Sequence, residues 1–153
     1  MRCEFCSVRG KPNWAGAEHL FETVKWLAET RRARQFFIVD DRLEEDRHGT
    51  VAFFEMIAKK YGSGLDFTVQ IRLEAAKDAE LLTVMKNAGV RNVCIGYESC
   101  LDEELIAMRK GYLSSDMVRW TKIFHRFGFF VHGMFIFGYP LKGQSPLSAP
   151  KKE

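Results

Sequence analysis

The sequence predicts an α/β protein with a parallel sheet. Short apolar runs alternate with longer segments in which apolar residues recur at helical spacing, and this alternation is typical of repeated βαβ units. Glycines close several of the helical segments, as they commonly do at helix ends. The chain has 153 residues, which is enough for one ordinary domain and too few for most complete (β/α) barrels.

The first part of the chain is predicted to form three helices and two strands. Leu20, Val24 and Leu27 recur at helical spacing in the first helix, and Asp78 is the expected N-cap of the third. The run from 35 to 39 is continuously apolar, which predicts a strand buried on both faces. The expected elements are a helix over 15–31, a strand over 35–39, a helix over 47–61, a strand over 67–72 and a helix over 78–89.

The second part is predicted to form two strands and two helices. Cys94 is expected to be a small core residue of its strand, and residues 109–111 are expected to form a solvated helix end. The expected elements are a strand over 92–97, a helix over 102–108, a helix over 115–127 and a strand over 130–137. Four aromatic side chains around the last strand are expected in the core or lining a barrel: Phe129, Phe130, Phe135 and Phe137.

Composition and charge narrow the class of protein. The 23 basic and 20 acidic residues leave a net charge of only +3, so the sequence does not predict nucleic-acid binding. A local patch at Arg31, Arg32 and Arg34 could meet a phosphate, although a solvated helix end is the simpler interpretation. No membrane span and no signal peptide is recognisable. A cytoplasmic protein is therefore expected.

Charged and polar residues stand where the predicted strands end. Ligands of a parallel sheet bind at the carboxyl ends of its strands, whether the sheet forms a barrel or is doubly wound. Glu98 ends an apolar strand, where a carboxylate without a partner is costly to bury. Asp40 and Asp41 allow a second interpretation, as a turn or helix-start signal. The residues at this predicted rim are Asp40, Asp41, Arg72, Glu74, Glu98, Ser99 and Tyr139.

A C-x-x-C pair, Cys3 and Cys6, stands at the start of the chain with Phe5 inside it. In a reducing compartment such a pair is more plausibly a metal or redox group than a disulfide. Two thiolates do not complete a zinc or iron–sulfur site. Either a third ligand lies upstream of Met1, or the pair has another role, including an incidental one.

Several segments, in order, resemble the radical S-adenosylmethionine (radical SAM) enzymes, whose signature is C-x-x-x-C-x-aromatic-C after the first strand. Residues 3–6 are similar to its second half. Later segments are similar to the subgroup whose full-length members often carry a cobalamin-binding domain upstream. These segments are Phe37-Ile38-Val39-Asp40-Asp41, Gly96-Tyr97-Glu98-Ser99, Met108-Arg109-Lys110-Gly111 and Phe135-Ile136-Phe137-Gly138-Tyr139-Pro140.

The resemblance implies a partial (β/α) barrel of the TIM type that is incomplete at both ends. The first cysteine of the signature would lie two positions before Met1. The family's partial barrel has six βα units, and here the first strand and the last unit are missing. The sequence is therefore expected to be a fragment of a radical SAM core over 1–140, followed by a disordered or foreign tail over 141–153.

The resemblance also implies the cofactors and their contacts. Cys3 and Cys6 would ligate a [4Fe-4S] cluster with one open iron for S-adenosylmethionine (SAM), and Phe5 would pack near the adenine. Reductive cleavage of SAM would yield a 5′-deoxyadenosyl radical. Cobalamin would enter through an upstream domain that this chain lacks.

The remaining SAM contacts are expected at the rim. Glu98 would take both ribose hydroxyls, and Asp40-Asp41 would accept from the ammonium group. Arg72 would reach the carboxylate of SAM. The backbone of Gly138-Tyr139 would flank the adenine. Implied partners are a reductant such as flavodoxin or ferredoxin and a substrate that the sequence does not identify.

Two rival hypotheses stay open at this stage. One is a truncated, inactive product or an interaction module that donates an open sheet edge to a partner chain. The other is a different βα protein that binds a small phosphorylated ligand at the same rim. The second rival has less support because no glycine-rich phosphate loop follows a strand.

Overall fold

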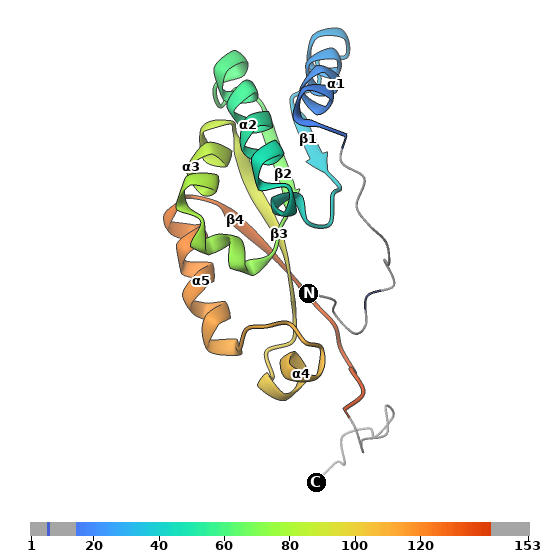
Figure 1. Ribbon diagram of the computed structural model, residues 1–153, viewed down its shortest axis with the longest axis vertical. Helices are drawn as coiled ribbons and strands as arrows, with labels where there is room; N and C mark the ends of the chain where they lie inside the picture. Colours follow the sequence, from blue (N-terminus) through green and yellow to red (C-terminus); the bar gives the residue numbers. More distant parts are fainter. Residues whose placement is uncertain (1–5, 7–14, 142–153) are drawn as a thin grey trace.

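The computed structural model describes Cys6 and residues 15–141, which form a layered α/β unit (Figure 1). Cys3, Phe5 and the predicted tail after Leu141 lie outside the described residues. The elements are α1 (Ala17–Thr30), β1 (Gln35–Ile38), η1 (Leu43–Glu45), α2 (Arg47–Tyr61), β2 (Asp66–Gln70), η2 (Leu73–Lys77), α3 (Ala79–Asn87), β3 (Val90–Glu98), α4 (Asp102–Ala107), α5 (Ser114–Arg126) and β4 (Phe130–Phe135).

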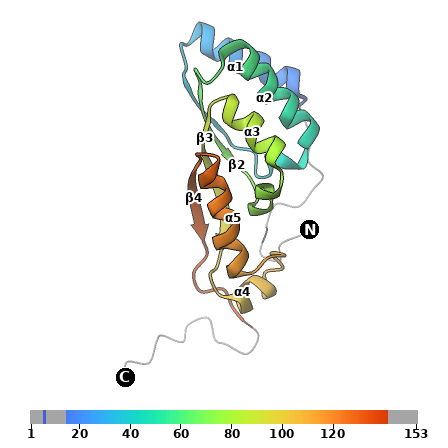
Figure 2. The ribbon, with the colours of Figure 1, turned by 90° about the vertical axis from the view of Figure 1, so that its left-hand side faces the viewer.

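The four strands form one sheet in the order β1-β2-β3-β4, and each neighbouring pair is parallel. Helices α1, α2, α3 and α5 lie along one face of this sheet, and the short helix α4 lies beyond the end of β3 (Figure 2). An open parallel sheet with its helices on one face is the architecture of a partial (β/α) barrel. The predicted fold class is confirmed.

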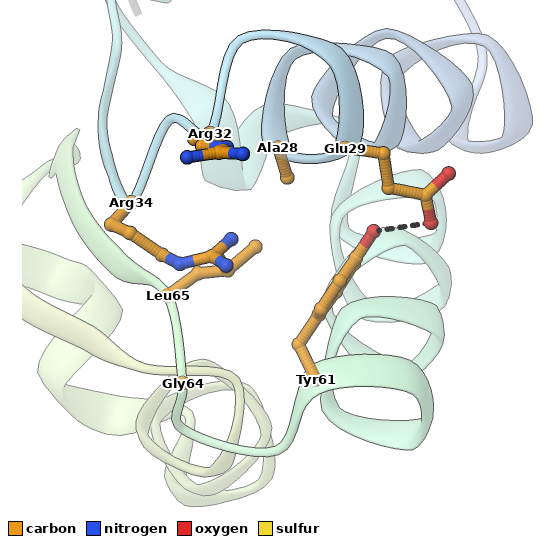
Figure 3. A pocket seen from close by; sticks show the side chains of 7 residues that line it. All are labelled: Ala28, Glu29, Arg32, Arg34, Tyr61, Gly64 and Leu65. Atoms are coloured by element: carbon orange, nitrogen blue, oxygen red, sulfur yellow. Dashed lines mark hydrogen bonds between the residues drawn. The ribbon is translucent and has the colours of Figure 1, made fainter.

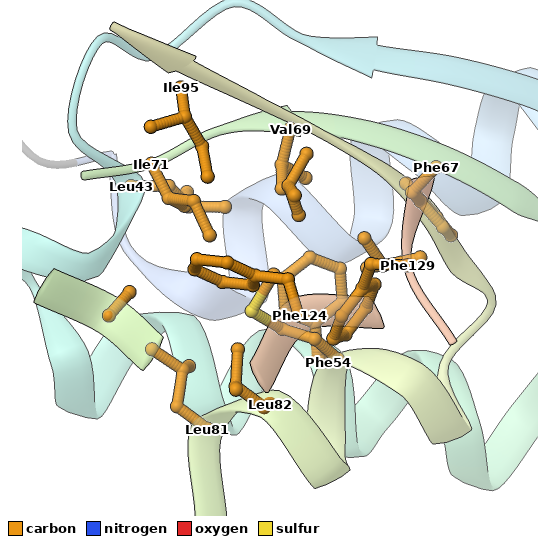
Figure 4. Packing of buried hydrophobic residues seen from close by; sticks show 14 of the residues in the cluster. Leu43, Phe54, Phe67, Val69, Ile71, Leu81, Leu82, Ile95, Phe124 and Phe129 are labelled. Atoms are coloured by element: carbon orange, nitrogen blue, oxygen red, sulfur yellow. The ribbon is translucent and has the colours of Figure 1, made fainter. Parts of the chain in front are cut away.

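The core lies between the sheet and these helices. Val69 of β2 and Ile95 of β3 point toward Phe54 of α2 and Phe124 of α5, and all four side chains are fully buried (Figure 4). The rings of Phe54 and Phe67 meet edge to face, with centroids 5.8 Å apart, a favourable arrangement for aromatic pairs. This apolar layer fixes the strands and so fixes the positions of the residues at their carboxyl ends.

Helices α2 and α3 each begin at an aspartate that caps the first turn. The carboxylate of Asp78 accepts a hydrogen bond from the backbone of Leu81, 3.0 Å away, at the start of α3, as predicted. Asp46 caps α2 in the same way through the backbone of Gly49 at 3.1 Å. These caps satisfy backbone donors that no helical carbonyl can reach. The two short 3₁₀ helices after β1 and β2 were not predicted.

The predicted burial of β1 on both faces is wrong. Phe36 and Ile38 pack against the core, whereas Phe37 is 57% exposed. The reason is that the helices cover one face of the sheet only, and among the described residues no element covers the other. Phe130, Phe135 and Phe137 are exposed, contrary to prediction, although the ring of Phe135 contacts that of the buried Tyr97. Phe129 is buried as predicted.

Cys94 is buried as expected, and burial raises the pKa of its thiol. Its strand neighbours Val93 and Ile95 belong to the core cluster. Because side chains alternate along a strand, Cys94 faces the opposite side of the sheet, where His132 of β4 is its register partner. The thiol of Cys94 therefore lies on the face of the sheet that the helices do not cover.

Candidate functional site

The carboxyl ends of the four strands bring the predicted rim residues to one end of the sheet. Arg72 follows β2, Glu98 ends β3, and residues 136–139 follow β4. Glu98 is the register partner of Phe135, and its carbonyl accepts a 2.7 Å hydrogen bond from the backbone of Ile136. The end of β3 and the segment after β4 therefore lie side by side.

The backbone at Glu98 has an unusual conformation. Its φ is +67°, in the left-handed region that side-chain-bearing residues rarely adopt, and the β3–β4 register shifts between Gly96 and Glu98. A Cβ on Gly96 would lie 2.3 Å from Oε1 of Glu98. The bulge thus turns the carboxylate back over the strand, into space that only glycine leaves free. Such strain is concentrated at functional sites.

Lys110 holds this carboxylate in place. Its Nζ lies 3.1 Å from Oε1 of Glu98, and the two side chains are only 9% and 14% exposed. Oε2 of Glu98 accepts no hydrogen bond from any residue of the described part of the chain. The carboxylate is thus fixed through Oε1, and within the described residues Oε2 has no hydrogen-bond donor. The prediction of a solvated helix end at 109–111 is wrong for Lys110, although Arg109 is exposed.

Tyr112 stabilises the same bulge of β3 by hydrogen bonding. Its hydroxyl donates to the carbonyls of Gly96 at 2.9 Å and Tyr97 at 3.2 Å. These carbonyls belong to the part of β3 where the register shifts, so the hydroxyl provides hydrogen bonds that the ladder does not. Sequence reasoning missed both Lys110 and Tyr112. For Lys110 the available signal was the segment 108–111, which carried the family resemblance without an assigned role; Tyr112 follows that segment directly.

Arg72 links the end of β2 to this pair. Its guanidinium forms an ion pair with Glu74 and donates to the carbonyl of Lys110 at 3.2 Å. Its backbone N–H donates to Oε1 of Glu44 at 3.2 Å. Protein groups therefore orient Arg72 at the rim. Its predicted contact with the carboxylate of SAM stays a prediction.

A hollow of about 290 Å³ lies beside Arg72. Three buried polar atoms around it have no hydrogen-bond partner among the described residues: Nε of Arg42, Oε2 of Glu44 and Oε2 of Glu74. Burial raises the pKa of Glu44, although backbone N–H groups and two arginines act against it. Buried water is the usual partner of such atoms in a polar hollow.

Asp40 and Asp41 follow β1 and are exposed. The side-chain amide of Gln70 donates to Oδ1 of Asp41 at 3.4 Å. Asp40 makes no hydrogen bond with a described residue. Neither caps a helix, because Asp46 has that role for α2. Asp41 lies in a turn that leads into η1, so the turn part of the competing interpretation is confirmed and the N-cap part is not. Both carboxylates are exposed.

Gly138 and Tyr139 follow β4 at the same end of the sheet. Gly138 has a φ of +76° and open space where a Cβ would be. Tyr139 is half-buried, while the adjacent Phe137 is 92% exposed.

Of the two predicted metal ligands, Cys6 is described and Cys3 is not. Cys6 is half-buried, and Cys3 and Phe5 are not described. Within Cys6 and residues 15–141, no three His, Cys, Asp or Glu side chains come together in a way that could hold a metal ion. A cluster would thus depend on the N-terminal cysteines. In the same part of the chain no helix is long and apolar enough to cross a membrane.

The fold agrees with a comparison against protein families. The model of the radical SAM superfamily matches residues 1–146, which is nearly the whole chain. The chain belongs to the radical SAM superfamily. No curated protein matches it.

Solved structures add a likeness in fold. The structure of the cobalamin-dependent S-adenosylmethionine radical enzyme OxsB with aqua-cobalamin and S-adenosylmethionine bound superimposes with a TM-score of 0.78 at 16% identity. The selenomethionine-labelled apo form gives 0.73, also at 16% identity. Both matches cover 88% of this chain and 22% of the OxsB chain. The chain thus spans about a fifth of the length of that protein, and the likeness concerns the fold.

Proposed function

We propose that this chain forms part of the core of a radical SAM enzyme, which binds a [4Fe-4S] cluster and cleaves SAM reductively. Family membership supports the reaction class. The observation that carries the assignment to this rim is the carboxylate of Glu98, whose Oε1 pairs with Lys110 and whose Oε2 has no donor among the described residues.

The donor groups of the rim suit the polar parts of SAM. A carboxylate with an open oxygen and spare lone pairs can accept from two ribose hydroxyls, which is the role proposed for Glu98. Asp40 and Asp41 offer accessible carboxylates for an ammonium group. Gly138 and Tyr139 follow Ile136, whose backbone bonds to Glu98, and their backbone is proposed to flank the adenine.

The chemistry of the site would come from the cluster, which supplies one electron to SAM and leads to a 5′-deoxyadenosyl radical. Cys3 and Cys6 are the proposed ligands in this chain, with a third thiolate from elsewhere. The rim residues orient the sulfonium end of SAM by holding its ribose and amino-acid groups. Lys110 is proposed to hold the carboxylate of Glu98 in position through their ion pair, and Arg72 donates a hydrogen bond to the backbone carbonyl of Lys110.

Cobalamin is proposed as a second cofactor of the complete protein, bound outside the described residues. The support is the likeness in fold to OxsB, whose structure contains aqua-cobalamin. A reductant such as flavodoxin or ferredoxin is proposed as the electron donor. The substrate is a separate question that this rim does not answer.

Anaerobic reconstitution with iron and sulfide tests the cluster proposal. With an external thiol present to complete the ligand set, the chain is expected to take up iron and sulfide and to show the broad visible absorption of an iron–sulfur cluster. The Cys3→Ala/Cys6→Ala variant should remain colourless. Cys94→Ala/Cys100→Ala is the matched control and should behave like the parent. Equal cluster content in all three proteins would overturn the assignment.

SAM binding tests the rim separately. Glu98→Gln should weaken SAM binding about tenfold or more, because a charge-assisted hydrogen bond to ribose is lost. Glu103→Gln, an exposed change on α4, is the control and should leave binding unchanged. A colourless chain that binds no SAM would instead favour the rival reading of an inactive product or interaction module.

A further inference from the structure

A second hollow lies at the opposite end of the sheet from the rim. It measures about 540 Å³ and lies where β1 and β2 begin. Arg32 and Arg34 border it from the connection between α1 and β1, and Tyr61 borders it from the end of α2 (Figure 3). We call this space the arginine hollow. Its volume falls within the range of small-molecule sites, roughly 300–1,000 Å³.

The arginine hollow carries excess positive charge. Within the described residues, Arg32 makes no ion pair, and Arg34 donates only to the adjacent carbonyl of Ala33, at 3.4 Å. The one carboxylate of the wall, Glu29, is already paired with Lys60 at 3.0 Å and accepts from the hydroxyl of Tyr61 at 3.3 Å. Two guanidinium groups therefore face the space without a counter-charge of their own.

Backbone hydrogen bonds and buried side chains hold the segment that carries these guanidinium groups. The backbone of Asp66 donates to the carbonyl of Arg34 at 2.8 Å, which ties the connection to the start of β2. Leu65 and Ala28 are buried beneath the hollow. Arg32 has a φ of +56°, a left-handed conformation that costs of order 1 kcal/mol for such a residue. Both side chains reach into the same space, with Tyr61 across from them (Figure 3).

The chemistry of the hollow indicates its ligand. Planar guanidinium groups match the oxygens of a phosphoryl group with paired hydrogen bonds. The volume exceeds what a single orthophosphate fills, and the ring of Tyr61 offers an apolar wall for an organic part. We propose that the arginine hollow binds a small molecule that carries a phosphoryl or diphosphoryl group. This site is distinct from the SAM rim and does not depend on the proposed function.

Titration of the chain with inorganic pyrophosphate at low ionic strength tests this proposal. Saturable binding is expected, with shifts in the NMR amide signals of residues 32–34 and 64–65. Arg32→Gln and Arg34→Gln should each weaken binding about tenfold. Arg31→Gln is the matched control, because Arg31 lies over the ring of Trp26 rather than in the hollow, and it should change binding less than twofold.

A variant expected to bind pyrophosphate more tightly separates the proposal from a loss of binding caused by misfolding. Glu29→Gln removes the negative charge of the wall and releases Lys60, so pyrophosphate should bind more tightly. The proposal is overturned if pyrophosphate does not saturate. It is also overturned if Arg31→Gln weakens binding as much as Arg32→Gln, or if Glu29→Gln weakens it. Since no cluster or SAM is present, these outcomes are separate from those for the rim.

Discussion

Replacing Lys110 by methionine should destabilise the protein strongly, because it leaves the carboxylate of Glu98 without its partner. The two side chains are 9% and 14% exposed, so little water can replace the ammonium group. Breaking a buried ion pair by removing one partner costs about 3–5 kcal/mol. The partial exposure of Glu98 places the expected loss near the lower limit, at about 3 kcal/mol.

Urea denaturation at neutral pH measures this loss. With a slope of about 2 kcal/mol per molar urea, the midpoint of Lys110→Met should fall by roughly 1.5 M. The double variant Lys110→Met/Glu98→Gln should recover much of the loss, since it buries no unpaired charge. Lys122→Gln, at an exposed position on α5, is the control. A midpoint for Lys110→Met within about 0.3 M of the parent would refute the buried-pair reasoning.

Three further changes test other parts of the structure. Glu44→Gln should stabilise by about 1 kcal/mol at pH 7, because burial raises the pKa of this carboxyl above 4.5, and the gain should vanish in urea titrations below that pH; a gain that grows on acidification would contradict this. Asp78→Asn should cost about 1 kcal/mol at neutral pH, since the Arg47 hydrogen bond lowers the pKa of Asp78 below 3.8, and the difference from the parent should shrink as the pH falls through that lowered value. Gly89→Ala should cost about 3 kcal/mol or more by urea denaturation, because φ is +92° and the new Cβ would lie 1.9 Å from the carbonyl oxygen of Leu65; a loss under about 1 kcal/mol would contradict the close approach.

The elements of the fold could be predicted from local patterns. Helix α3 is an example, because Asp78 caps its start and apolar residues recur along it. The edges of the sheet could not be predicted in the same way. An apolar run such as 35–39 shows that a strand forms, but whether both of its faces are covered depends on elements distant in sequence. Phe37 is exposed for that reason.

The candidate site shows the same division between local and distant information. The carboxylate of Glu98 was predicted at the rim because a charged residue ends an apolar strand. Its partner was missed, because Lys110 follows a short helix and looks solvated in sequence. Only the turn of the chain after α4 returns Lys110 to the end of β3. The left-handed backbone of Glu98 and the role of Gly96 depend on the same contact.

Cleavage of SAM is the most direct measurement of the central proposal. The polypeptide as its gene encodes it would be reconstituted with iron and sulfide, reduced with dithionite and supplied with SAM under anaerobic conditions. We predict methionine and 5′-deoxyadenosine in equal amounts, after uptake of one electron and one hydrogen atom, and loss of both products in Cys3→Ala/Cys6→Ala. Intact SAM beside a fully assembled cluster, or undiminished cleavage by that variant, would contradict the proposal.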